Sequence, residues 1–131
     1  MGFWRVLFWP LKKRQLRTLR TRVGLNRFEF SECFSDDIFQ KQVAGMVWDH
    51  VQPFIVVDEF LPSPEDDIRK IYGIDEEELD EDLILTLLER LSIPVPEKAE
   101  VSKFGEIKTL RDVIMFISFS HQISRSTKTY A

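Results

Sequence analysis

The 131-residue sequence has few of the residues that build disulfide frameworks and metal sites. It contains one cysteine, Cys33, and two histidines, His50 and His121. A single cysteine excludes an internal disulfide framework and a multi-cysteine zinc site, and two histidines exclude a histidine-rich zinc site. The glycine-rich motifs Gly-x-x-x-x-Gly-Lys and Gly-x-Gly-x-x-Gly, which hold nucleotide phosphates, do not occur. We therefore predict no metal and no other cofactor.

Long apolar runs are lacking too. A transmembrane helix needs about 20 apolar residues, and the aromatic, apolar run at residues 1–9 is far shorter. A secretory signal carries its positive charge before its apolar segment, whereas here the order is reversed. We expect a cytoplasmic protein, with peripheral contact to the inner membrane as an open alternative.

The charge is distributed very unevenly. Residues 1–27 hold eight bases and no acid, a net charge of +8, whereas the remaining 104 residues hold 10 bases and 22 acids, a net charge of −12. Hydrophobic residues make up 44% of the chain, enough for the core of one domain. Such asymmetry within one chain suggests two separate electrostatic tasks.

The basic segment has the pattern of an amphipathic helix from residue 11 to residue 23. Leu16, Leu19 and Val23 share one side, and the bases cluster on the opposite side. Aromatic residues beside a basic face are typical of interfacial membrane helices. The candidate residues for a membrane or another anionic surface are Trp4, Phe8, Trp9, Lys13, Arg14, Arg17 and Arg20. Two alternatives stay open. In the first, the tryptophans cover the core and the bases are merely solvated. In the second, the segment binds nucleic acid, but the acidic remainder of the chain would repel a duplex.

The remainder predicts a mainly α-helical protein. Caps and stops predict helices over residues 36–53, 64–72, 75–91 and 109–117, with Ser63, Asp75 and Thr109 as N-caps and Gly73 as a stop. Residues 97–108 are expected to be a loop. We divide the chain into a basic aromatic extension at 1–34, a helical domain at 35–120 and a polar tail at 121–131.

The helix over 75–91 combines a leucine stripe with an unusual density of acids. Carboxylates in a first turn offset the helix dipole, but six acids within residues 76–82 exceed what capping needs. We predict a protein-docking surface, with a plain solvated face as the alternative. An EF-hand calcium loop is not expected, because Leu79 stands where the loop needs an oxygen ligand and the central glycine is lacking. The predicted partner-binding residues are Glu76, Glu77, Glu78, Asp80, Glu81, Asp82, Ile74 and Leu79.

Nucleophilic catalysis finds little support. Glu32 precedes Cys33, and a neighbouring acid raises a thiol pKa rather than lowering it. His50 is expected to be a half-buried structural residue. We predict that the protein is not an enzyme.

Several short segments resemble the acyl carrier protein family. Gly73-Ile74-Asp75 is similar to the start of that family's helix II motif, and residues 83–91 resemble helix II itself. Val95-Pro96 and residues 107–117 resemble the following corner and the Thr-capped final helix. The resemblance covers about 80 residues, extends to a group of small enterobacterial proteins built on the same plan, and implies a four-helix bundle.

One position departs from the family pattern. The family attaches phosphopantetheine to a serine, and here either Glu77 or Glu78 aligns with it, depending on the register. Because glutamate has no hydroxyl, the resemblance implies the fold and the acidic docking helix but not carrier activity. We therefore predict a non-catalytic protein that docks a basic partner protein. The alternatives are an acidic, immunity-type inhibitor of a bacterial toxin and a membrane-surface adaptor.

Overall fold

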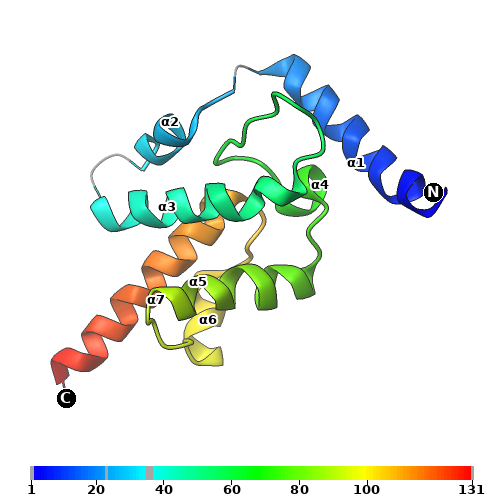
Figure 1. Cartoon of the computed structure of the whole chain (residues 1–131). Helices are drawn as coiled ribbons and strands as arrows, with labels where there is room; N and C mark the ends of the chain where they lie inside the picture. Colours follow the sequence, from blue (N-terminus) through cyan, green and yellow to red (C-terminus); the bar gives the residue numbers. More distant parts are fainter. Residues whose placement is uncertain (1, 23, 35–36, 131) are drawn as a thin grey trace.

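The computed structural model describes residues 2–22, 24–34 and 37–130, with side chains at 9–22, 24–34 and 37–126. This part of the chain is mainly α-helical (Figure 1), as predicted. The helices are α1 (Gly2–Thr21), α2 (Arg27–Glu32), α3 (Ile38–Val51), α4 (Ile68–Tyr72), α5 (Leu85–Arg90), α6 (Lys98–Phe104) and α7 (Leu110–Tyr130). A 3-10 turn, η1 (Gln52–Phe54), follows α3, and a π-helical segment, η2 (Glu78–Ile84), leads into α5.

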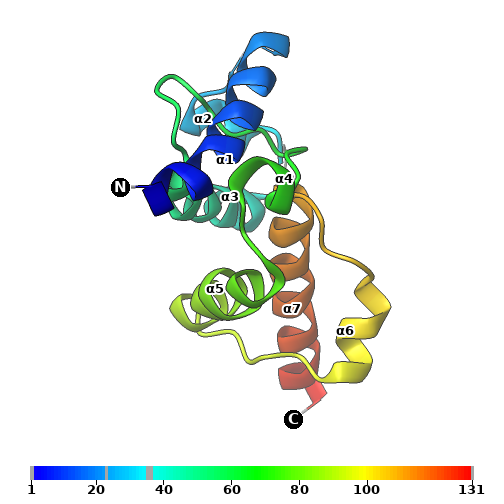
Figure 2. The same ribbon diagram turned by 90° about the vertical axis from the view of Figure 1, so that its right-hand side faces the viewer.

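The core gathers around α3, which packs against both α2 and α7. The rings of Phe30 from α2 and Trp48 from α3 meet edge to face at 5.5 Å. Below α3 in Figures 1 and 2, the helix formed by η2 and α5 lies beside α7. The leucine stripe predicted for this helix is confirmed, because Leu83, Leu87 and Leu88 are almost fully buried.

Local signals set most helix ends. Asp37 caps α3 by accepting a hydrogen bond from the Gln40 amide, and Gly73 ends α4 in the left-handed region with φ 67°. Thr109 caps α7 as predicted, because its hydroxyl accepts from the Asp112 amide at 3.1 Å. The predicted cap of α4 at Ser63 is wrong, since Asp67 caps that helix instead.

Two helices lie where none was predicted. Helix α2 begins with a reciprocal capping box between Asn26 and Glu29. Helix α6 occupies the segment predicted as a loop, and its Phe104 ring packs edge to face on Phe116 at 5.2 Å.

The segment predicted as a polar tail continues α7. The backbone is helical through Tyr130, and no glycine or proline follows Gly105 to interrupt it. His121 stacks on Phe39 with ring centroids 4.1 Å apart. This contact attaches the start of the segment to α3.

The N-terminal segment packs on the domain instead of standing apart from it. Helix α1 lies along α4 (Figures 1 and 2), and Gln15 is fully buried there. Phe30 and Phe34, also within the predicted extension, are 0% and 5% exposed and belong to the hydrophobic core. The core therefore includes side chains from both sides of the predicted boundary at residue 34, because these aromatic rings are buried against α3 and its neighbours.

Candidate functional site

The helix with the acidic run begins with a capping box. The Asp75 carboxylate accepts a hydrogen bond from the Glu78 amide at 2.8 Å, and the Glu78 carboxylate accepts from the Asp75 amide at 3.3 Å. This reciprocal pair satisfies two amides that the first turn would otherwise leave without partners. Glu78 is half-buried and takes part in these two hydrogen bonds within the chain.

Five other predicted carboxylates are exposed: Glu76, Glu77, Asp80, Glu81 and Asp82. We call these five residues the acidic surface. Glu76 forms an ion pair with Arg69 at 3.4 Å, and both side chains are mostly solvent-exposed. Among the residues with described side chains, none lies within ion-pair distance of the other four carboxylates. Most of the negative charge is thus left uncompensated locally.

The two apolar residues predicted to contact a partner are mostly buried and are reached from solvent only through a pocket. Ile74 is 3% exposed and Leu79 is 9% exposed, and both belong to the core. Leu85 is the exposed apolar side chain on this helix, at 41%. Sequence analysis missed it, although a leucine outside the buried stripe was the available signal.

The acidic surface overlaps the π-helical segment η2, which holds Asp80, Glu81 and Asp82. At its end, the Leu85 amide donates to the Asp80 carbonyl, five residues back rather than four. Segments of this kind are rare and frequently occur at functional sites. The spacing of the leucines gave no sign of it, because the buried stripe is equally compatible with an α-helix.

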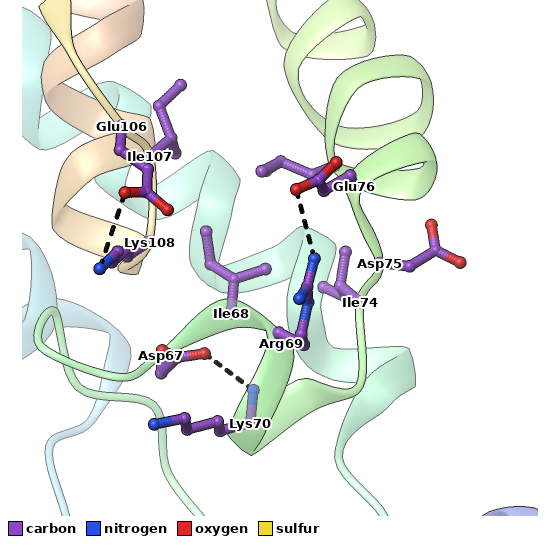
Figure 3. A pocket seen from close by; sticks show the side chains of 11 residues that line it. Asp67, Ile68, Arg69, Lys70, Ile74, Asp75, Glu76, Glu106, Ile107 and Lys108 are labelled. Atoms are coloured by element: carbon purple, nitrogen blue, oxygen red, sulfur yellow. Dashed lines mark hydrogen bonds and ion pairs between the residues drawn. The ribbon is translucent and has the colours of Figure 1, made fainter.

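A pocket of about 250 Å³ adjoins the acidic surface. It lies between α4, the first turn of the acidic helix and residues 106–108 (Figure 3). Ile68, Ile74, Leu79 and Ile107 supply its apolar lining. Its volume is large enough to admit one apolar side chain.

Charged groups around this pocket largely pair with one another. Figure 3 shows Arg69 against Glu76, and the Lys108 amine lies 3.6 Å from the Glu106 carboxylate. Asp67 accepts the Lys70 backbone amide at 2.8 Å as the cap of α4. Serine, cysteine and histidine do not occur among the lining residues, so the pocket offers shape and charge but no side-chain nucleophile of these types.

Helix α1 carries the basic residues singled out from the sequence. Lys13, Arg14, Arg17 and Arg20 are exposed, whereas Leu16 and Leu19 are partly buried against the core. The predicted amphipathic pattern is therefore confirmed for these side chains. Trp9 is 60% exposed, and the side chains of Trp4 and Phe8, like all of Val23, lie outside the described part of the structure.

A buried polar network, which sequence analysis missed, anchors the end of α1. Arg22 forms an ion pair with Asp66 and donates to the Leu61 carbonyl at 2.6 Å. The Tyr72 hydroxyl and the Ser63 amide also donate to the Asp66 carboxylate, at 2.6 Å and 2.9 Å. Burial, followed by the charge of Asp66, raises the pKa of Tyr72 well above its ordinary value. The polar groups of this network are hydrogen-bonded to one another, and the network holds the end of α1 on the loop before α4.

The residues considered for catalysis lie apart from the pocket. Cys33 is exposed, and its thiol lies 3.4 Å from the Glu29 carbonyl. His50 is half-buried as predicted, and burial, followed by the charge of Arg90, lowers its pKa. Neither residue lines the pocket beside the acidic surface.

Within the described residues, no group of three histidine, cysteine, aspartate or glutamate side chains is arranged to hold a metal ion. No helix in that part of the chain is both long enough and apolar enough to cross a membrane. No family model matches the chain, and no curated protein or solved structure is significantly similar to it.

Proposed function

We propose that this protein is a non-catalytic binding protein that docks a basic partner protein through the acidic surface. The observation that carries the proposal is the set of four carboxylates without ion pairs, Glu77, Asp80, Glu81 and Asp82. Like charges this close repel one another and oppose folding. A basic partner would remove that repulsion on binding.

The surroundings of the acidic surface suit a two-part interface. Uncompensated carboxylates attract a basic surface over long distances and raise the association rate. Leu85 and the adjoining pocket offer apolar contacts, which limit dissociation once the partner has arrived. The two features lie on or beside the same helix, so one partner surface can use both.

The proposal includes an acyl-carrier-like plan for the helical domain. The order of α3, the acidic helix, the short α6 and the Thr109-capped α7 supports it. Glu77 and Glu78 occupy the two positions that could align with the family's attachment serine. A domain of this plan without that serine would keep the docking helix and lose the carrier chemistry.

The test uses a triple charge reversal on the acidic surface, Glu77→Lys, Asp80→Lys and Glu81→Lys. These three side chains take no part in the capping box or the core. Proteins captured by the full wild-type chain from its own cells are identified, and one is purified. At low ionic strength, this partner should associate with the triple variant at least about 10-fold more slowly than with the wild-type chain. The difference between the two rates should shrink as salt rises.

The matched control reverses three exposed acids elsewhere, Asp58→Lys, Glu59→Lys and Glu97→Lys. Both triple variants change the net charge equally, so only the position of the charge differs. The control should associate faster than the acidic-surface variant by the same 10-fold. Equal rates for the two variants, or no partner retained by the wild-type chain, would refute the docking role.

A further inference from the structure

One face of α1 forms a continuous stripe of an aromatic residue and bases. Trp9, Lys13 and Arg17 are spaced four residues apart, and Arg20 follows three residues later. This spacing places them on one side of a helix, and all four are exposed. The stripe, which we call the basic face, spans about 16 Å along the helix axis.

Contacts on the opposite side fix the direction of the basic face. Gln15 is fully buried, and it points away from Lys13 and Arg17 around the helix. Its side-chain amide donates to the Phe54 and Ile71 carbonyls, each at 2.9 Å. Because these contacts hold the helix in one rotational setting, the basic face is directed away from the domain.

The bases of this face are not neutralised within the described structure. Lys13, Arg17 and Arg20 form none of the ion pairs found among the described side chains. Figures 1 and 2 both show α1 beside α4, with the acidic helix below α4. The positive and negative surfaces therefore lie on two different helices.

We propose that the basic face docks this protein on a bilayer that contains anionic phospholipids, with the Trp9 ring at the headgroup level. Bases attract anionic headgroups, and an exposed indole in line with them is suited to the boundary between headgroups and acyl chains. Nucleic acid fits less well, because a duplex has no apolar layer beneath its phosphates to take up the exposed indole of Trp9.

Vesicle flotation tests this proposal with the full chain. Vesicles of phosphatidylcholine alone are compared with vesicles that also contain phosphatidylglycerol. We expect binding to the anionic vesicles only, and weaker binding at high salt. Each base near an anionic surface contributes roughly a factor of five in affinity. The triple variant Lys13→Gln, Arg17→Gln and Arg20→Gln should therefore bind about 100-fold more weakly.

The matched control is Arg90→Gln, Lys98→Gln and Lys103→Gln, which removes three exposed bases from α5 and α6. It should bind vesicles as the wild type does, whereas Trp9→Ala should bind more weakly although all charges remain. Circular dichroism checks that each variant is folded. Equal loss in both triple variants, equal binding to neutral vesicles, or tighter binding to duplex DNA at the same salt would overturn the proposal. If the variant Lys13→Gln, Arg17→Gln and Arg20→Gln does not fold, two other comparisons test the proposal. They are the vesicle binding of Trp9→Ala against wild type, and the binding of wild type to neutral against anionic vesicles.

Discussion

Replacement of Gln15 by leucine should destabilise this protein strongly, because three backbone groups depend on one side chain. The Gln15 amide donates to the Phe54 and Ile71 carbonyls, and its carbonyl oxygen accepts the Val56 amide, each at 2.9 Å. Leucine has a similar size but cannot replace any of these hydrogen bonds. Gln15→Leu therefore leaves three backbone groups without their hydrogen-bond partner at a fully buried position, and it creates little empty space.

The magnitude follows from the number of groups left without a partner. A buried polar group that loses its partner costs about 1–3 kcal/mol, so the lower end gives a loss of about 3 kcal/mol for three groups. With an unfolding entropy of about 2.1 cal/mol/K per residue, a 131-residue chain should lose about 10 °C in Tm. With a urea m-value of about 1–3 kcal/mol/M, the midpoint should fall by about 1–3 M.

Urea and thermal unfolding, followed by circular dichroism, measure this loss. The control is Gln42→Leu on α3, which makes the same chemical change at an exposed position and should alter stability by less than about 0.5 kcal/mol. A Gln15→Leu variant as stable as this control would show that α1 is not anchored to the domain through Gln15.

Two further predictions concern His50 and the missing attachment serine. The pKa of His50 lies below its ordinary value of 6.5 because of burial and, secondarily, Arg90. The unfolded chain therefore takes up a proton that the folded chain lacks, and stability should fall as pH drops below 6.5; an NMR titration that gives a pKa of 6.5 or more would contradict this. Co-expression with a broad-specificity phosphopantetheinyl transferase should leave the intact mass unchanged, since Glu77 and Glu78 have no hydroxyl. A mass gain of one phosphopantetheine group would contradict the proposed plan.

The features that sequence analysis predicted correctly are those with local causes. A cap or a stop acts on the turn beside it, so Thr109 and Gly73 could be identified without knowledge of the fold. The Asn26 and Glu29 pair of α2 has the same kind of signal, an N-cap residue followed three positions later by glutamate. It was missed because the preceding run of bases led us to treat this segment as an extension.

Long-range pairings had no such signal. Gln15 and Ile71 are 56 residues apart, and Arg22 and Asp66 are 44 residues apart. Nothing in a helical pattern shows which polar residue will be buried against which backbone group. The burial of Ile74 and Leu79 was equally hard to foresee, because an apolar side chain near an acidic run suits a partner or the core equally well.

The polar anchors of α1 also explain how one helix can serve both the domain and an external surface. An apolar contact alone, such as that of Leu16 and Leu19 with the core, would tolerate rotation of the helix about its axis. Hydrogen bonds are directional, so Gln15 and the Arg22–Asp66 ion pair specify a single rotational setting. A turn of the helix by one residue, about 100°, would carry Lys13 or Arg20 toward buried surface, where an unpaired charge is strongly disfavoured. The buried amide of Gln15 and the exposed charges of Lys13 and Arg17 therefore favour the same orientation, in which the helix is held from inside and its positive field is directed outward.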